Sequence, residues 1–301
     1  MNEAVNMHFV PQTYLKRFAR EIKKGNKSVF LINSLNTHTL NIKEIDIRDV
    51  CYEKNLYRLE GDRPEERQFI ELMYRLLFED GYNSLYSKLS NEHEIYLTPE
   101  ERDNVIGFVV SMFYRNTVWN RIHDQLSNEI LDRAFYHKER TGIDVFVKDG
   151  QEISIANMTL DEAKKKDKVQ TRQLSAVIAP EKIFQLTQLR RTTDIISVHK
   201  LPDGFEFVTS DHPVLPTNKE GVHLIPMDPT NTLYLPIDTK HLLCLTHCKD
   251  FTGIDKNMIG RMPANNLLAK VYTNMNNKGH LHYTERWIFG SDNELKKFKP
   301  I

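Results

Sequence analysis

The chain is predicted to adopt an α+β fold, in which a helical half packs on an antiparallel, curved sheet formed mostly by the last third of the chain. Helical patterns fill residues 60–192, and short strand patterns fill residues 193–301. Segregated helices and strands are typical of α+β proteins, whereas a repeating βαβ order would predict a parallel sheet. We expect a single domain over residues 1–301, with a motif at residues 8–20 bridging the two halves.

The composition predicts a folded protein with a mixed surface. Hydrophobic residues make up 40% of the chain, with 15 Phe and 12 Tyr, so a substantial core can form. The 41 basic and 41 acidic residues cancel, which excludes a global attraction to nucleic acid or to an anionic membrane. Three cysteines do not make a disulfide framework. Without a signal peptide or a long apolar run, we expect a cytoplasmic protein with no membrane partner.

The clearest element is a helix that begins at Thr98. The segment Thr98-Pro-Glu-Glu101 fits a capping box, in which threonine and glutamate satisfy the first backbone N–H groups of a helix. An earlier helix is expected over residues 62–79, where a stripe with Glu71 and Glu79 interrupts an otherwise apolar pattern. Further helices are expected over residues 11–20, 120–138, 161–168, 180–191 and 264–274.

Short runs rich in β-branched and aromatic residues predict the strands. Pro, Asp and Gly interrupt these runs at close intervals and mark where each strand ends. Two strands near the N-terminus are expected around a turn at residues 34–37. The predicted strands are residues 29–33, 38–42, 195–199, 204–208, 232–235, 241–245, 280–283 and 286–289.

Motifs spread along the chain carry a family resemblance. The two most specific are His8-Phe-Val-Pro-Gln-Thr-Tyr-Leu-Lys-Arg-Phe18 and Thr209-Ser-Asp-His-Pro213. The weaker ones are Asn55-Leu-Tyr57, the helix acids Glu71 and Glu79, Arg115-Asn-Thr117, Leu235-Pro-Ile237, and Asn265 or Asn266 before Ala269. Together they resemble the family titled domain of unknown function 4238. The resemblance implies a bacterial, cytoplasmic, single-domain protein, and for some relatives a setting of antiphage defence, but no established activity.

The N-terminal motif contains side chains capable of chemistry. His8 titrates near neutrality and can act as a general base, a general acid or a metal ligand. Arg17 can hold a phosphate or carboxylate, and Tyr14 shares its helix face. The structural alternative is that His8 caps the helix while Tyr14 belongs to the core.

The second specific motif follows the predicted strand at residues 204–208. A carboxylate at a strand end, such as Asp211, is well placed to bind a metal or to act as a base, and His212 is a neighbouring candidate ligand. The structural alternative is an Asx turn, in which Asp211 holds its own backbone before Pro213.

Two predicted helices supply further polar groups. Glu71 lies on an apolar helix, so it can face an internal polar site and join Asp211 and His8 as oxygen and nitrogen ligands of a hard cation. A solvent-exposed stripe with an ion pair is the alternative. Arg115 follows a buried stretch of helix, so it needs either a partner acid or a ligand such as phosphate, which the adjacent Asn116 can help to bind.

Together these residues favour a hydrolase, either a nuclease or another phosphodiesterase, with a divalent cation (Mg²⁺ or Mn²⁺) and with nucleic acid or nucleotide as partner. The catalytic groups would be His8, Asp211 and Glu71, with the metal on Asp211, Glu71 and His212. The groups that bind substrate phosphate would be Arg17, Arg115, Asn116 and Tyr14.

Two alternatives remain open. The first is a non-catalytic sensor or binding module that recognises a nucleotide, a nucleic acid or a protein ligand through the same polar pocket. The second is a buried ion-pair network that specifies the fold and has no ligand.

Overall fold

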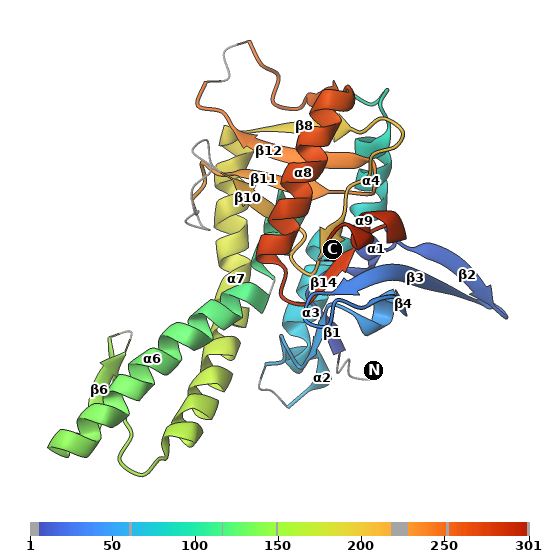
Figure 1. Cartoon of the computed structure of the whole chain (residues 1–301). Helices are drawn as coiled ribbons and strands as arrows, with labels where there is room; N and C mark the ends of the chain where they lie inside the picture. The colour runs from blue at the N-terminus through green and yellow to red at the C-terminus, as the bar shows by residue number, and fades with distance from the viewer. Residues whose placement is uncertain are drawn as a thin grey trace.

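The computed structural model describes residues 6–59, 62–115, 117–148, 150–217, 228–250 and 253–299. It has an α+β fold with mainly antiparallel sheets, which confirms the predicted class. A body of helices and sheets carries a long helical arm, visible at the lower left of Figure 1. The arm consists of α6 (Thr117–Thr141) and the first part of α7 (Leu160–Thr193), with the hairpin β6 (Val145–Lys148) and β7 (Gln151–Ser154) between them.

The first sheet comes from the last third of the chain, as predicted. Its strand order is β10 (Leu215–Thr217), β11 (Thr232–Pro236), β12 (His241–His247), β8 (Asp194–Lys200) and β13 (Ile259–Pro263). Every pairing is antiparallel except that of β13 with β8, which is parallel.

Strand β12 explains why this sheet is buried on both faces. Leu243 and Leu245 belong to the main hydrophobic core, whereas Leu242 and Cys244 belong to a smaller cluster that includes Ala269 of α8 (Asn266–Tyr283). Because successive side chains point to opposite faces of a strand, the unbroken apolar run of β12 serves both layers. Figure 1 shows α8 crossing one face of the sheet.

The second sheet joins the two ends of the chain, which was not predicted. Strands β2 (Arg20–Lys24), β3 (Lys27–Asn36) and β4 (Ile42–Asp46) come from the N-terminal part. Strand β14 (Trp287–Phe289) pairs with β3 on one side and with β9 (Thr209–Ser210) on the other.

Several predicted boundaries at the N-terminus were wrong. The helix expected over residues 11–20 is only α1 (Gln12–Leu15), and the chain re-enters a sheet at Arg20. The turn expected at residues 34–37 is shifted, because β3 continues to Asn36. The Asn36 side chain then accepts from the backbone N–H groups of His38 and Thr39, which places the turn after Asn36.

The capping box at Thr98 is confirmed. Thr98 Oγ1 accepts from the Glu101 N–H at 3.2 Å, and the Glu101 carboxylate accepts from the Thr98 N–H at 2.8 Å, at the start of α5 (Pro99–Tyr114). The helix predicted over residues 62–79 is divided. It consists of α2 (Pro64–Arg67), α3 (Phe69–Tyr74) and a π-helical turn, η2 (Arg75–Glu79), followed by α4 (Tyr82–Ser90).

Three helices are longer than predicted, and α6 extends three residues beyond the predicted range of 120–138 at each end. Helix α7 continues through Pro180, where we expected separate helices over residues 161–168 and 180–191. Helix α8 continues through residues 280–283, which were predicted as a strand. Tertiary contacts explain the extra turns of α8. Asn276 and His280, one turn apart on this helix, bond to the Val208 carbonyl and to Ser210. The predicted strand at residues 204–208 is absent, and the short strand β9 follows it instead. The chain ends with α9 (Asp292–Lys296).

The main hydrophobic core unites segments far apart in sequence. It contains Phe9 and Leu15 from the N-terminal motif, Val109 and Phe113 from α5, and Leu235 from the first sheet. The N-terminal motif therefore packs against both the helices and the sheet. In the part of the chain that the structure describes, no helix has the length and apolar character that a membrane crossing requires.

Candidate functional site

The N-terminal motif is positioned by a short strand pair. Strand β1 (Asn6–His8) pairs with β5 (Tyr52–Lys54), which follows the 3-10 turn η1 (Ile47–Asp49). This register places His8 opposite Tyr52, with their ring centroids 5.7 Å apart. His8 is half-buried, so its ring stays partly accessible while its backbone faces the interior.

Arg115 lies directly beneath this strand pair. Its side chain has 0% exposure. Nη1 donates to Glu79 Oε1 at 2.5 Å, and Nη2 donates to the His8 carbonyl oxygen at 2.7 Å. The guanidinium carbon lies 4.3 Å from the centroid of the Tyr74 ring, a cation–π arrangement. Of the two alternatives expected for Arg115, a partner acid or a ligand, the structure shows a partner acid in Glu79.

The π-helical turn η2 explains how Glu79 reaches Arg115. The Asp80 N–H bonds to the Arg75 carbonyl at 3.0 Å, which is the five-residue spacing of a π turn. Such a turn inserts an extra residue into the helical repeat and is frequent at functional sites. It leaves Leu76 and Leu77 exposed while Glu79 pairs with the buried guanidinium.

Glu71 approaches the same arginine from α3. Burial raises the pKa of Glu71 to about 7, the Arg115 charge opposes this, and the Glu79 carboxylate adds to it. Its Oε2 atom is buried without a hydrogen-bond partner among the residues that the structure describes. A carboxyl group that titrates near neutrality is suited to accepting or donating a proton at physiological pH.

His8 has the complementary property. Burial lowers its pKa, although a hydrogen bond to the backbone of Arg48 and the Glu79 charge oppose this effect. Gln12 Nε2 lies 3.4 Å from both ring nitrogens. Both the His8 imidazole and the Glu71 carboxyl interact electrostatically with Arg115 and Glu79. Groups with such pKa values can exchange protons with a bound molecule. We call His8, Glu71, Glu79 and Arg115 the Arg115 cluster.

Asp211 has a different role from that predicted. Its carboxylate accepts from three consecutive backbone N–H groups, those of Glu285 (3.1 Å), Arg286 (2.7 Å) and Trp287 (2.9 Å). It therefore anchors the segment that enters β14, rather than closing an Asx turn on its own backbone. Burial raises the pKa of Asp211 to about 7. No described contact links it to His8 or Glu71.

His212 is enclosed between aromatic rings. Its ring lies 6.1 Å from that of Phe113 and 5.4 Å from that of Tyr283, and burial lowers its pKa to about 4. The neighbouring His280, whose pKa burial lowers to about 3, has Nδ1 2.9 Å from Ser210 Oγ. Both imidazoles are therefore neutral at physiological pH.

The residues predicted to hold a metal do not come together. Glu71 belongs to the Arg115 cluster, whereas Asp211 and His212 lie in the layer between β14 and α8. Over the described ranges, no three His, Cys, Asp or Glu side chains form a group that could hold a metal ion.

The remaining predicted residues also separate. The Tyr14 hydroxyl lies 2.6 Å from Thr209 Oγ1 and donates to the Pro236 carbonyl at 2.7 Å, so Tyr14 ties the two sheets together within the core. Arg17 stacks 3.9 Å from the centroid of the Tyr86 ring and donates to Asn83 on α4. Asn116 lies outside the described residues.

Sequence reasoning missed a polar group beside Arg17. The Tyr86 hydroxyl donates to Asp238 Oδ2 at 2.8 Å, and His241 Nδ1 lies 2.8 Å from the same oxygen. In the described part of the chain, the His241 ring nitrogen Nε2 is buried without a hydrogen-bond partner. The i,i+3 spacing of Asp238 and His241 across a tight turn was the available signal.

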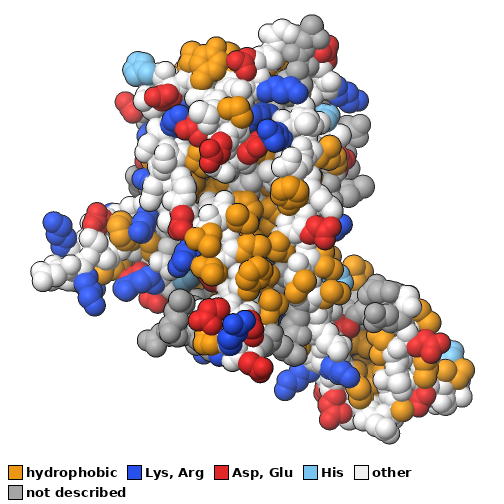
Figure 2. Space-filling view, turned by 180° about the vertical axis from the view of Figure 1, so that it is seen from behind, with side chains coloured by type: hydrophobic (Ala, Val, Ile, Leu, Met, Phe, Trp, Pro, Cys, Tyr) orange, Lys and Arg blue, Asp and Glu red, His pale blue; other side chains and the backbone are white. Residues whose placement is uncertain are grey.

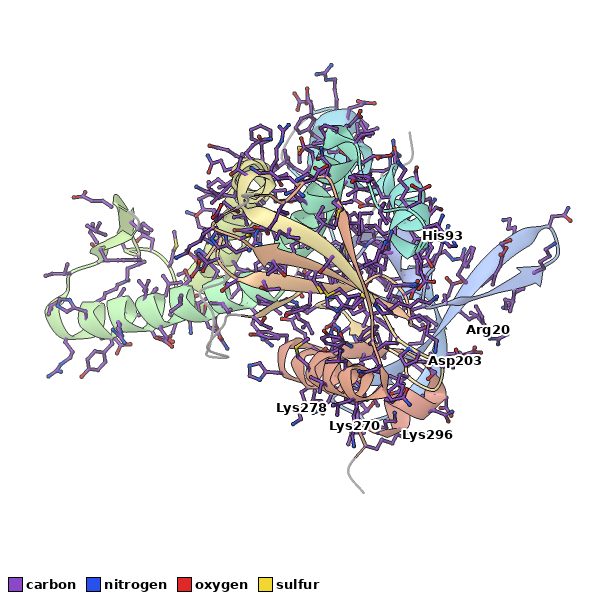
Figure 3. The ribbon with its side chains drawn as sticks, turned by 90° about the horizontal axis from the view of Figure 1, so that it is seen from above. Arg20, His93, Asp203, Lys270, Lys278 and Lys296 are labelled. Carbon is purple, nitrogen blue, oxygen red and sulfur yellow. The ribbon has the colours of Figure 1, made fainter. Side chains whose placement is uncertain are left out.

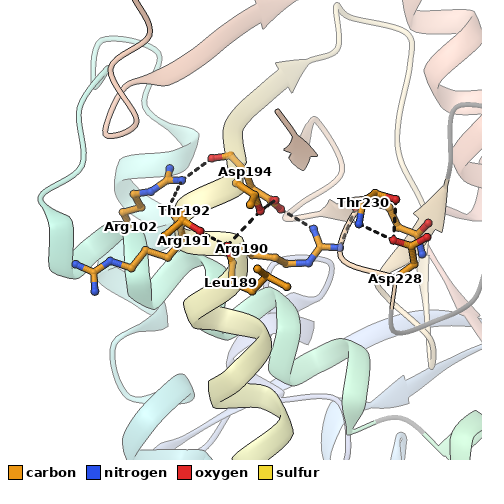
Figure 4. A network of polar contacts seen from close by, with 10 residues as sticks. Arg102, Leu189, Arg190, Arg191, Thr192, Asp194, Asp228 and Thr230 are labelled. Carbon is orange, nitrogen blue, oxygen red and sulfur yellow. Dashed lines mark hydrogen bonds and ion pairs between the residues drawn. The ribbon is translucent and has the colours of Figure 1, made fainter. Parts of the chain in front are cut away.

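A separate buried network of hydrogen bonds and ion pairs joins the end of α7 to the start of β8 (Figure 4). Arg190 Nη1 donates to Asp194 Oδ2 at 2.5 Å, and its Nη2 donates to the Asn231 carbonyl at 2.9 Å. Arg102 of α5 donates to the backbone carbonyls of Asp194 and Arg191. The terminal nitrogens named above bond to protein groups, whereas Arg102 Nε and Arg190 Nε are buried without a partner among the described residues. Because these bonds tie α5, α7 and β8 together, we interpret the network as structural.

The surface around α8 and α9 carries a groove of about 780 Å³. Lys270 and Lys278 line it, and Figure 3 shows them along the outer side of α8, with Lys296 on α9 nearby. No predicted site residue lines this groove.

Comparison with known proteins identifies the family but not an activity. No curated protein and no solved structure matches the chain. A family model with the description "Protein of unknown function (DUF4238)" matches residues 6–294, which is nearly the whole chain and includes every residue of the Arg115 cluster. The chain therefore belongs to the DUF4238 family, as the motifs indicated.

Proposed function

We propose that this protein is a hydrolase in which Glu71 and His8 transfer protons. The observation that carries the proposal is the pair of half-buried groups with shifted pKa values, a carboxyl near neutrality and a neutral imidazole, held beside the buried Arg115. Perturbed titratable groups of opposite role in one place are typical of acid–base catalysis.

Arg115 acts in this proposal as a positioning residue. Its two terminal nitrogens bond to Glu79 and to the His8 carbonyl, and its guanidinium lies against the Tyr74 ring, so it fixes the strand and the helix that present the two proton-transfer groups. Glu79 neutralises the charge of Arg115, so Glu71 can change its protonation state without leaving a buried cation unpaired.

An exposed cation next to the cluster supports an anionic substrate. Arg75 lies one helical turn after Glu71, is exposed, and its charge lowers the pKa of Glu71. A guanidinium in this position suits a phosphodiester, the substrate class of a nuclease or phosphodiesterase. Glu71 would then serve a phosphoryl group bound at Arg75, with His8 as the second proton-transfer group.

A second candidate function is a non-catalytic binding module. Four exposed apolar side chains lie on α3 and η2 beside Glu71, namely Phe69, Leu72, Leu76 and Leu77. Figure 2 shows hydrophobic side chains gathering across the middle of the body on one face. Exposed apolar surface of this kind supports recognition of a protein ligand next to the polar cluster.

The test is an activity screen with matched variants. Wild type is incubated with RNA, DNA and nucleotides, with and without Mg²⁺ or Mn²⁺, so that the predicted divalent cation is tested in the same experiment. Glu71→Gln and His8→Ala should each reduce turnover at least a hundredfold, while Gln68→Ala on the same helical stretch leaves it unchanged.

Two outcomes would contradict the hydrolase proposal. One is a folded wild-type protein that leaves every substrate intact. The other is activity that survives both variants. Ligand-dependent thermal stabilisation without turnover would support the binding module instead.

A further inference from the structure

The helical arm exposes a second apolar surface that its own packing does not use. Ser127 and Leu131 of α6 are buried and, with Ala163 of α7, form the interior of the arm. Ile122, Leu126 and Ile130 recur every four residues on another flank of α6, and all three are exposed. A solvated helix does not need such a stripe.

Helix α7 continues this surface. Helical spacing relative to the buried Ala163 places Val169 and Val177 on the flank of α7 that adjoins the α6 stripe, and both are exposed. The arm is therefore a two-helix hairpin with a buried seam inside, where Ser127 donates to Asp167, and an apolar face outside. Two such hairpins, packed face to face, complete a four-helix bundle.

We infer that this protein forms a dimer in which the outer apolar faces of two arms pack together as a four-helix bundle. A two-fold axis along the arms would place α6 of one copy against α7 of the other. The occupant of the exposed face is thus a second copy of this chain.

The size of the face fits this occupant. A helix of 25 residues such as α6 is about 37 Å long, and two helices side by side are about 20 Å wide. The face is then about 700 Å², close to the roughly 800 Å² per partner of a standard interface.

The charged residues beside the outer apolar face also fit a second copy of this chain. Within the arm, Lys164 pairs with Asp132 at 2.6 Å, which sets the level at which α6 and α7 face each other. In the described part of the arm, the exposed Glu129 of α6 and Lys166 of α7 are without ion pairs, and they lie near that level. The proposed axis brings Glu129 toward the partner's Lys166, and the reverse contact follows by symmetry.

The test is the oligomeric state of the full chain, measured by sedimentation over a concentration series. Wild type should be a dimer, and Leu126→Glu with Ile130→Glu should raise the dissociation constant at least a hundredfold. Leu267→Glu on α8, where the leucine is 72% exposed, is the matched control and should leave the dimer intact. Circular dichroism checks that each variant remains folded.

A charge swap makes the geometry specific. Glu129→Lys alone and Lys166→Glu alone should each weaken self-association at least threefold, because like charges then meet at both symmetric contacts. A mixture of the two variants should form heterodimers as tight as the wild-type dimer. A monomeric wild type, a dimer insensitive to the arm variants, or a mixture that fails to form heterodimers would each overturn the inference.

Discussion

Arg115 donates a hydrogen bond to the backbone carbonyl of His8 at 2.7 Å, across 107 residues of sequence, and pairs with Glu79 through its other terminal nitrogen. One buried guanidinium therefore holds the first strand of the fold against the helix that ends beside it. The two residues were selected separately from the sequence, as a candidate base and a candidate phosphate ligand, and the structure joins them through backbone rather than through a substrate.

Arg115→Ala should destabilise the protein by about 3 kcal/mol, because it removes a fully buried guanidinium and leaves the partly buried Glu79 charge without its partner. Urea unfolding measures the change. Arg75→Ala, at an exposed position one turn from Glu79, is the control and should stay within about 0.5 kcal/mol of wild type. Equal losses for both variants would show that the buried pair has no special weight.

Asp211→Ala should lower the free energy of unfolding by about 2–5 kcal/mol, because it removes the acceptor of three backbone N–H groups before β14. Asp211→Asn keeps one carbonyl oxygen and should cost less than Asp211→Ala. The exposed Asp203→Ala is the control. If Asp211→Ala left stability unchanged or raised it, Asp211 would belong to a functional site instead.

Glu71→Gln should change how stability depends on pH. The pKa of Glu71 is about 7 in the folded protein, above the unfolded value of about 4.3, so folding favours its protonated form. Its contribution is complete below the unfolded pKa and is lost as pH rises through about 7. Relative to wild type, the glutamine variant should gain stability between pH 4.5 and 8, by at most about 3 kcal/mol.

Thermal and urea unfolding at several pH values measure this difference. Glu79→Gln, at the paired acid, should not reproduce the gain, because its ion pair with Arg115 would be lost at every pH. Parallel pH curves for wild type and Glu71→Gln would contradict the shifted pKa.

His212→Phe should act in the opposite pH direction. The pKa of His212 is about 4 in the folded protein, below its unfolded value of about 6.5, so the neutral ring is favoured by folding. This contribution is complete above pH 6.5 and is lost as pH falls toward 4. Wild type should therefore lose up to about 3 kcal/mol more than the phenylalanine variant between pH 7 and 4. Chemical unfolding at both pH values is the measurement.

Local signals in the sequence were the reliable ones. The capping box at Thr98 predicted the start of α5 because its two hydrogen bonds lie within four residues. The apolar runs predicted most strands of the first sheet. Arg115 was expected to need either a partner acid or a ligand, because burial of an unpaired guanidinium is costly wherever it occurs, and the structure pairs it with Glu79.

The misses share a physical cause. The prediction ended helix α8 too early, because its last turns are held by Ser210 and Val208, which lie some 70 residues away. The bonds of Asp211 to the segment before β14 and the register of the second sheet depend on pairings between the two ends of the chain. Such pairings leave no local pattern, since propensity describes only neighbouring residues.

The position of β14 near the C-terminus also determines when the second sheet can form during synthesis. Strands β2 and β3 leave the ribosome early, but β14, which pairs with residues 34–36 of β3, is made only at residues 287–289. Until then one edge of β3 exposes unpaired backbone groups, which can pair with other chains. A nascent or C-terminally truncated chain should consequently depend on chaperones, and loss of the last fifteen residues should cause aggregation rather than a smaller folded protein.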